Sequence, residues 1–418
     1  MLSHEEQYVR LADGFPEALS RAEVIGDSVA DEISASRPFR DMYRRELGVG
    51  PHQKLVLITS TWGGLSALGG APDLFRRAMA ELPRDEYRVL AAIHPNAWHG
   101  HGGWQLTHWL RPHLDAGLLL PDPAGDTWKA AVCAADVFLG DHGSLTLYAA
   151  DQGVPGLLGS FDDDRVAPGS PMERIGRQLP RVSAVRPLEP QLRAASTVAE
   201  AGDLVTSHPG EALRRLRALS YRRLELPEPP WPIAPRAVPL PLRLPTVRRS
   251  PATPAHLVTA RVDGDTVRLR RYPAHHQRHQ DAHLRGAHLV AEDGDPDTQV
   301  RDRARVLVTR RADPEKLFRG RPDLRVVARP LPEGCEVTVQ DGPRLVVRAA
   351  EEDPDPMLVG ATVLALLDQG AGQRPPPPEV TVDLGAARSA LRLVPLVEEG
   401  PNLADADFAA QSLVQDEG

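Results

Sequence analysis

Residues 54–61, with the sequence KLVLITST, form a short apolar run that ends in small polar residues, as a buried strand does. Similar runs recur along the first half of the chain, at residues 87–94, 117–121, 136–141, 154–160 and 181–185. Helical patterns lie between them, at residues 72–82, 128–135, 144–151 and 210–224. Strands that are apolar along their length and alternate with helices are typical of a parallel sheet covered on both faces. We therefore predict an α/β fold for this part of the chain.

The composition excludes several classes of function. The chain has 418 residues, with 49 Lys and Arg against 57 Asp and Glu, so its net charge of -8 does not favour a nucleic-acid partner. The two cysteines, Cys133 and Cys335, form no disulfide or metal motif, which is typical of a reducing compartment. The N-terminus has no signal-peptide pattern, and no apolar run reaches the roughly 18–20 residues of a bilayer span. We expect a cytoplasmic protein that is not integral to a membrane.

Changes in composition divide the chain into parts. Residues 226–254 contain ten prolines and are predicted to form an extended linker. Residues 255–400 have short alternating runs, Asp-Gly turns at 263–264 and 341–342, and one clear helix at 356–370. We predict an α/β domain at 51–225, the Pro-rich linker at 226–254, a small α+β domain at 255–400 and an acidic tail, disordered, at 401–418.

The loop after the first predicted strand is the first candidate for ligand contact. It contains Ser60, Thr61, Trp62 and Gly63, followed by further glycines. Small residues let a ligand approach the backbone, and hydroxyl groups can reach its polar atoms. The loop lacks the Lys-Ser/Thr ending of a phosphate-binding P-loop, so a P-loop NTPase is disfavoured. A flexible strand-to-helix turn without a ligand is the alternative.

A second candidate is the His94-Pro95-Asn96 segment at the end of the strand predicted at residues 87–94. A histidine there can act as a general base or donate a hydrogen bond to a phosphate. The alternative is a histidine that bonds only to the backbone at a strand end. His99, His101 and His108 follow, but they do not form a closed zinc ligand set.

The third candidate is the GDHGS segment at residues 140–144. We expect Ser144 to cap the next helix, whose free N–H groups and positive dipole end can bind a phosphate or diphosphate. Gly143 would let the phosphate come close, and Asp141 would bond to a sugar or glycerol hydroxyl or brace His142. An ordinary capped turn is the alternative. Because the carboxyl ends of parallel strands meet at one edge of a sheet, we expect the three loops to converge.

Together these motifs, with Gly-Val-Pro at 153–155, resemble a known family. Over residues 20–225 the chain is similar to the C-terminal, donor-binding half of GT-B transferases, and more narrowly to CDP-glycerol glycerophosphotransferase-like proteins. The resemblance implies a Rossmann-like domain that binds a nucleotide-diphosphate-activated glycerol or sugar donor, in cell-envelope polymer synthesis. It places His94 and the Asp141–Ser144 turn at the donor's diphosphate, and we expect His94, Asp141 and His142 to be catalytic residues. The donor-binding residues would be Ser60, Thr61, Trp62, Gly63, Asn96, Gly143 and Ser144.

The sequence departs from that family before residue 51. A GT-B enzyme needs two Rossmann-like domains, and here residues 1–50 are expected to be the remnant of an upstream domain and an interdomain helix. A separate N-terminal-domain-like protein would then supply the second half of the site. The alternatives are a noncatalytic interaction protein that retains half a GT-B fold and a protein similar to UDP-sugar 2-epimerases, so enzymatic activity is left open.

Neither a cofactor nor a metal is expected, because a helix dipole and a histidine can neutralise the donor's diphosphate. A second group of histidines, His275, His279 and His283, would share one face of a helix. Their stretch is polar and rich in arginine, and we favour a surface loop over a metal site there.

Overall fold

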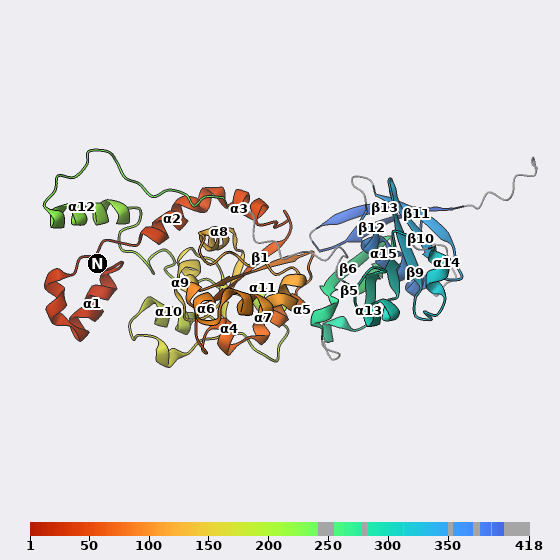
Figure 1. The fold of residues 1–418 in the computed structure, drawn as a ribbon, viewed down its shortest axis with the longest axis horizontal. Helices are drawn as coiled ribbons and strands as arrows, with labels where there is room; N and C mark the ends of the chain where they lie inside the picture. The colour runs from red at the N-terminus through yellow and green to blue at the C-terminus, as the bar shows by residue number, and fades with distance from the viewer. Residues whose placement is uncertain are drawn as a thin grey trace, which may run out of the picture. The chain divides into compact units, whose positions relative to one another are not determined.

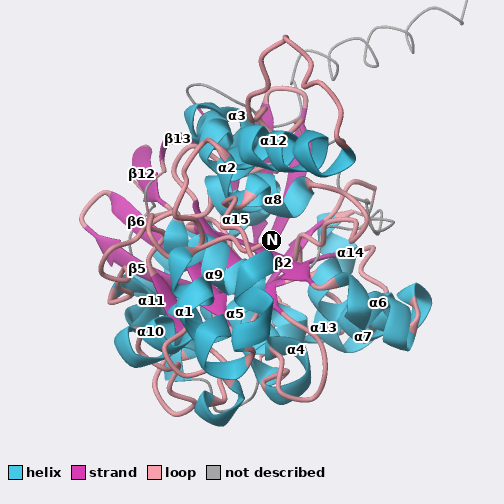
Figure 2. Cartoon of the chain, turned by 90° about the vertical axis from the view of Figure 1, so that its left-hand side faces the viewer, coloured by secondary structure: helices cyan, strands magenta, loops and turns pink. Residues whose placement is uncertain are grey.

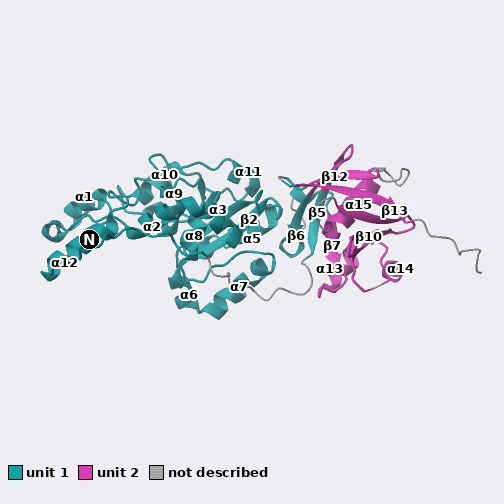
Figure 3. Cartoon of the chain, turned by 90° about the horizontal axis from the view of Figure 1, so that it is seen from above, with its two compact units in different colours: residues 1–259, 270–287, 384–387 teal, residues 260–269, 288–383, 388–418 magenta. Residues whose placement is uncertain are grey.

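The computed structural model describes residues 1–240, 255–277, 282–311, 313–349, 354–370, 377–385 and 387–396. The predicted acidic tail and the second half of the predicted linker lie outside these ranges. The chain forms two compact units (Figure 3). Unit 1 consists of residues 1–259, 270–287 and 384–387, and unit 2 of residues 260–269, 288–383 and 388–418.

A four-stranded parallel sheet forms the centre of unit 1, and its strand order is β2-β1-β3-β4. Figure 1 labels its strand β1. Its strands are β1 (Lys54–Ser60), β2 (Tyr87–Ile93), β3 (Val137–Gly140) and β4 (Gly156–Leu158). Alternate residues of β1 enter two different cores: Leu55 and Leu57 belong to one, and Val56 and Ile58 to the other. Both faces of the sheet are therefore covered, as the continuous apolar runs predicted.

Helices supply the rest of both cores, and Figure 2 shows them surrounding the strands. One face of the sheet is covered by α2 (Ser28–Ser36), α3 (Arg40–Glu46), α8 (Thr127–Ala134), α9 (Ser144–Asp151) and α10 (Pro171–Gln178). The other face is covered by α5 (Asp73–Glu81), α6 (Pro95–His101), α7 (Gly103–Asp115) and α11 (Leu188–Arg193). The remaining helices of unit 1 include α1 (Glu5–Gly14), α4 (Ala67–Gly70) and α12 (Ala212–Leu224).

Two of the predicted strands do not form. At residues 117–121 only Leu119 bridges to β2. The run is too short for a strand, because only three leucines lie between Gly117, which has a φ of +104°, and Pro121. At residues 181–185 only Arg181 bridges to β4, and Val185 is 93% exposed. Both predictions were wrong, since neither segment is long enough or buried enough to add a full strand to the sheet.

Residues 1–50 pack against the sheet of unit 1, and the Pro-rich segment bonds to them. Ile33 of α2 and Tyr43 of α3 are buried in its core. The Tyr43 hydroxyl donates to the carbonyl of Val238, and the Ser36 hydroxyl accepts from the Val238 backbone N–H. Within residues 226–240, the Pro-rich segment thus contacts α2 and α3 through a buried valine.

Nine strands of the described residues form a closed barrel. Seven of them belong to unit 2, and β5 and β6 each belong partly to unit 1 and partly to unit 2. The strands are β5 (His256–Asp263), β6 (Thr266–Pro273), β7 (His288–Glu292), β8 (Val306–Val308), β9 (Val326–Leu331), β10 (Gly334–Val339), β11 (Arg344–Ala349), β12 (Glu379–Asp383) and β13 (Arg388–Pro395). The prediction of a small α+β domain therefore did not include the barrel. Pairs such as β6–β12 join segments more than a hundred residues apart, which hairpin signals cannot predict.

The helix predicted at residues 356–370 is α15 (Pro356–Gly370), and it contacts β7, β8, β9 and β10. Residues 357–365 of α15 are all buried, as expected of a helix that is apolar on every side. Two shorter helices, α13 (Thr298–Arg303) and α14 (Pro314–Phe318), lie between strands of unit 2. Among the described residues, no helix is long and apolar enough to span a bilayer.

Candidate functional site

Asp141 joins two loops at the carboxyl edge of the parallel sheet. One carboxylate oxygen accepts hydrogen bonds from the backbone N–H groups of Thr61 (2.7 Å) and Ala67 (2.9 Å), and the other accepts one from Gly143 (2.8 Å). Burial raises the pKa of this carboxyl group, although the three hydrogen bonds act to lower it. Asp141 is fully buried. It therefore holds the loop after β1 against the turn after β3.

The loop after β1 uses most of its polar groups internally. The buried Ser60 hydroxyl accepts a hydrogen bond from the Leu68 backbone N–H at 3.0 Å, and Ser66 caps α4 through the Gly69 N–H at 3.0 Å. Gly63 has a φ of +88°, which disfavours any residue with a Cβ atom. The indole of Trp62 is 57% exposed. Of the four residues predicted here, Trp62 and Gly63 are exposed, and Trp62 is the one with a large side chain open to solvent.

The turn after β3 fixes the start of α9. Gly143, and not Ser144 as predicted, is the N-cap of this helix, and no side chain caps it. A Cβ atom on Gly143 would lie 2.8 Å from that of Thr61, so the close approach of the two loops requires glycine. The Thr146 hydroxyl bonds to Thr59 (2.7 Å) and to the Asp141 backbone N–H (3.1 Å). Ser144 is exposed at the first position of a helix that is firmly attached to the sheet.

His94 follows β2 and caps α6. Its Nδ1 atom accepts a hydrogen bond from the Asn96 backbone N–H (3.1 Å), and its own backbone N–H donates to the carbonyl of Ser60 (2.9 Å). Because Nδ1 is an acceptor, the proton of the neutral imidazole is on Nε2. Its ring therefore presents a hydrogen-bond donor at the edge of the sheet.

His94 and Ser144 line the same cavity, which has a volume of about 270 Å³. The sheet topology explains this, since β2 and β3 flank β1 and end at the same edge. Trp62, Asn96 and His142 are not among the lining residues. The cavity is lined by Val29, Ala92, Ile93, His94, Pro95, Pro121, Asp122, Pro123, Trp128, Ser144, Leu145 and Tyr148.

Two aromatic side chains form one wall of this cavity, and neither was predicted from the sequence. The rings of Trp128 and Tyr148 lie 5.8 Å apart, tilted by 40°. The Tyr148 hydroxyl donates to a carboxylate oxygen of Asp27 (3.1 Å), and burial raises the pKa of this phenol. Lys129 Nζ lies 5.8 Å from the centre of the Trp128 ring. These contacts hold both rings in place beside the start of α9.

His142 lies next to the cavity but points elsewhere. Its ring packs edge-on against Phe161 with 6.2 Å between the ring centres, and its Nδ1 atom is buried without a hydrogen-bond partner among the described residues. Asn96 is exposed and uses its backbone N–H to bond to His94. The catalytic roles predicted for His94, Asp141 and His142 stay predictions, because position alone assigns no role.

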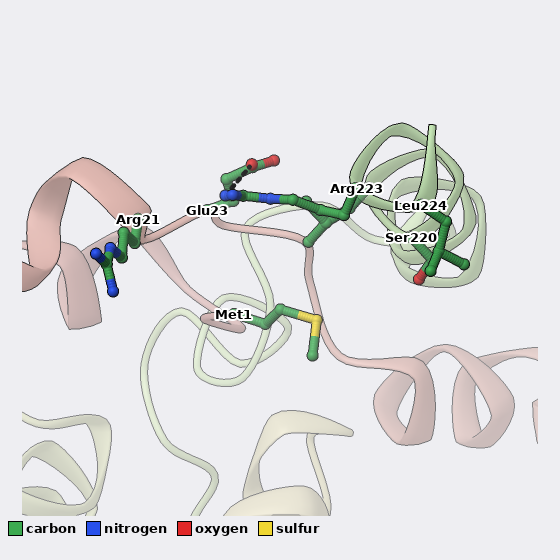
Figure 4. Close-up of a pocket in the computed structure, with 7 residues that line it drawn as sticks. Met1, Arg21, Glu23, Ser220, Arg223 and Leu224 are labelled. Atoms are coloured by element: carbon green, nitrogen blue, oxygen red, sulfur yellow. Dashed lines mark ion pairs between the residues drawn. The ribbon is translucent and has the colours of Figure 1, made fainter. Parts of the chain in front are cut away.

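A second cavity of unit 1, about 400 Å³, involves none of the predicted site residues (Figure 4). It lies between the N-terminal segment and α12, and Glu23 forms an ion pair with Arg223 (3.6 Å) at its rim. Its other lining residues are Met1, Arg21, Leu219, Ser220 and Leu224.

Within the described residues no group of three or more His, Cys, Asp or Glu side chains could hold a metal ion. His99, His101 and His108 are exposed. His279 lies outside the described residues, so the second predicted histidine group is only partly described. His276, which follows His275 of this group, is buried and bonds to His113 on α7 (2.9 Å).

No family model and no curated protein matches this chain. Several solved structures of the wall teichoic acid polymerase TagF are similar to part of it. One has 16% sequence identity and a TM-score of 0.28, and covers 39% of this chain and 38% of that chain. A variant soaked with CDPG has 15% identity and a TM-score of 0.28, covering 38% and 36%. The chain thus spans well under half the length of these proteins.

Proposed function

We propose that unit 1 is the donor-binding part of a transferase, and that it binds a nucleotide-diphosphate-activated glycerol or sugar in the 270 Å³ cavity. One observation carries the proposal: His94 and Ser144, from two different strand ends, line one cavity together with the Trp128 and Tyr148 rings. An anion-binding end and an aromatic wall are the two features that a nucleotide diphosphate needs.

The diphosphate would lie against the first turn of α9. The first N–H groups of a helix have no partner within the helix, and its dipole favours negative charge there. Ser144 is exposed at this point, and its hydroxyl can add a further hydrogen bond. The Nε2–H group of His94, oriented by the Nδ1 bond to Asn96, would donate to a phosphate oxygen.

The nucleobase would contact Trp128 and Tyr148, because planar aromatic rings stack on one another and exclude water. Pro121 and Pro123 add further apolar surface to the cavity. The volume of about 270 Å³ is just below the usual range of roughly 300–1,000 Å³ for ligand sites, so we expect the transferred glycerol or sugar to lie outside. There an acceptor hydroxyl would replace the nucleotide.

In such a transfer, negative charge collects on the departing phosphate, and preorganised donors stabilise it. His94 and the start of α9 would have this role. Asp141 would be a positioning residue, because its three backbone hydrogen bonds set the loops around α9. His142 and Trp62 remain candidates for contact with the transferred group or with a partner.

A separate N-terminal-domain-like protein remains part of the proposal. Large apolar side chains are exposed within residues 1–50, as a docking surface would require. They are Met1, Tyr8, Val9, Phe15, Phe39 and Met42. A protein similar to the 2-epimerases would bind the same class of donor, whereas a noncatalytic protein would lack affinity for the nucleotide. Donor binding is therefore the property to test first.

The test is binding of CDP-glycerol, UDP-glucose, CDP and UDP, measured by thermal shift and calorimetry on the whole chain. A ligand at a hundred times its Kd stabilises the native state by about 2.7 kcal/mol, which is readily measured. We expect at least one of the four to bind, His94→Ala to weaken it at least tenfold, and His99→Ala, an exposed histidine on the same helix, to leave it unchanged. Failure of all four to bind at millimolar concentration would reject the proposal.

A further inference from the structure

Helices α6 and α7 present an aromatic face that the donor site does not use. The two helices contact each other at the edge of unit 1 (Figure 3). On α7, Leu106, Leu110 and Leu114 are buried in the core, so the opposite side of the helix faces outward. Trp104 is 80% exposed and Trp109 is 47% exposed, and the two lie toward opposite flanks of the outward half of the helix, about 140° apart around its axis. We call Trp104, Trp109, His101 and His108 the aromatic face.

The rings of the aromatic face support one another. Trp104 and His108 are stacked, with 5.3 Å between their centres and 8° between their planes. His101 packs edge-on against Trp109, with 5.0 Å between centres and an angle of 62°. Each indole is thus held by an imidazole while much of its surface remains in water. Two large apolar rings kept exposed in a fixed arrangement indicate a binding surface.

The charges around this face narrow the class of partner. From residue 95 to residue 115 the charged residues are Arg111 and Asp115, which form an ion pair with each other (2.9 Å). A nucleic acid or an anionic membrane would require unneutralised Arg or Lys. An apolar protein partner would be expected to contact aliphatic side chains as well, yet the α7 leucines are buried. A neutral ligand with hydroxyl groups fits better.

We propose that the aromatic face binds the sugar rings of a neutral oligosaccharide. The C–H face of a pyranose ring is apolar and flat enough to lie on an exposed indole such as Trp104. The ring's hydroxyl groups can exchange hydrogen bonds with His101, His108 and the exposed amide of Gln105. The ligand needs no charge of its own, in agreement with the paired Arg111 and Asp115.

The aromatic face is continuous with the candidate donor site through α6. This helix begins at Pro95, which lines the 270 Å³ cavity, and ends at His101 of the aromatic face. A saccharide bound there would be suitably placed to act as the acceptor. The role of the saccharide as acceptor rests on the proposed function. Binding of the saccharide to the aromatic face does not depend on it.

The test is a titration of the whole chain with cellohexaose and with chitohexaose, followed by calorimetry and tryptophan fluorescence. We expect the wild type to bind at least one of them, and Trp104→Ala to weaken binding at least tenfold. Trp231→Ala is the matched control, because Trp231 is 64% exposed but lies in the Pro-rich segment, and it should bind as the wild type does. His94→Ala should also leave saccharide binding unchanged, which separates this result from that of the donor site.

Two results would overturn the proposal. The first is that the wild type binds neither oligosaccharide; if phosphatidylcholine or phosphatidylglycerol vesicles bind instead and Trp104→Ala abolishes this, the face is a membrane-contact surface. The second is that Trp104→Ala binds the oligosaccharides as tightly as the wild type while circular dichroism shows both to be folded.

Discussion

The parallel sheet of unit 1 and the barrel differ in where they place their strand ends. In the sheet, β1, β2 and β3 run in the same direction, so the residues that follow them gather at one edge. In the barrel, the neighbours from β9 through β10, β11 and β13 to β12 are antiparallel, so successive strand ends lie at opposite rims. Distant polar residues therefore converge in the sheet more readily than in the barrel.

The largest effect is expected when the Asp141 side chain is removed from the edge of the sheet. In Asp141→Ala, the buried N–H groups of Ala67 and Gly143 and the half-buried N–H group of Thr61 lose their acceptor, at about 1–3 kcal/mol for each buried group. We expect a loss of roughly 3–5 kcal/mol in urea unfolding, with faster hydrogen exchange in the loop after β1. In unit 2, Asp297 accepts two N–H groups at the start of α13, and Asp297→Ala should cost only about 1 kcal/mol. Equal effects would contradict a special role for the sheet edge.

The next test compares two glycines that face side chains in the two units. A Cβ atom on Gly156 of β4 would lie 2.1 Å from the ring of Phe138, which is fully buried. On Gly360 of α15 it would lie 2.5 Å from one methyl group of Val306. We expect Gly156→Ala to cost about 3 kcal/mol, and Gly360→Ala clearly less, because alanine also favours the helix by about 1 kcal/mol. Thermal unfolding of the two variants measures the difference, and a reversed order would contradict this packing.

Buried histidines are expected to give a pH-dependent stability in both units. In unit 1, burial lowers the pKa of His113 and His256, and lowers that of His276 to about 4. In unit 2, burial lowers the pKa of His288 to about 4. The unfolded chain binds these protons below about pH 6.5 while the folded chain does not, so acidification from about 6.5 towards 4 destabilises the fold. Glu86 and Asp151 oppose this, because burial raises the pKa of both carboxyl groups.

Glutamine variants isolate the histidine contribution. Gln can replace a neutral histidine as a hydrogen-bonding group but does not titrate. We expect His276→Gln and His288→Gln to lose less stability than the wild type between pH 6.5 and 4, by up to about 1.4 kcal/mol per pH unit. Urea unfolding at a series of pH values measures this. Variant and wild-type curves that stay parallel over this range would show that neither histidine is kept neutral by the fold.

The fold could be predicted where local patterns dominate. The strands β1 and β2 were predicted to within one residue at each end, and α9 and α15 with their observed bounds, since each is a continuous apolar or helical run. Helix α7 was missed because Gly, His, Trp and Pro112 obscure its three buried leucines. The closure of the barrel was missed because it depends on pairing between distant segments.

The candidate site could be predicted only in part. That His94 and Ser144 would be brought together follows from the order of parallel strands, which the apolar runs indicated. Trp128 and Tyr148 were missed because they lie on helices, whereas the site was predicted from residues at strand ends. The burial of Asp141 could not be read from the sequence either, since it depends on how the loop after β1 folds back over β3.

The proposal that a phosphate binds at the start of α9 is tested most directly by placing a negative charge there. Glutamate is favourable at a helix N-terminus, so Ser144→Glu should fold normally, yet its carboxylate would occupy the place proposed for a phosphate. Ser144→Gln adds nearly the same volume without the charge. We predict that calorimetry with the nucleotide that binds best will show at least a tenfold loss of affinity, about 1.4 kcal/mol, for Ser144→Glu relative to Ser144→Gln. Equal affinities of the two variants would contradict an anion site at this helix.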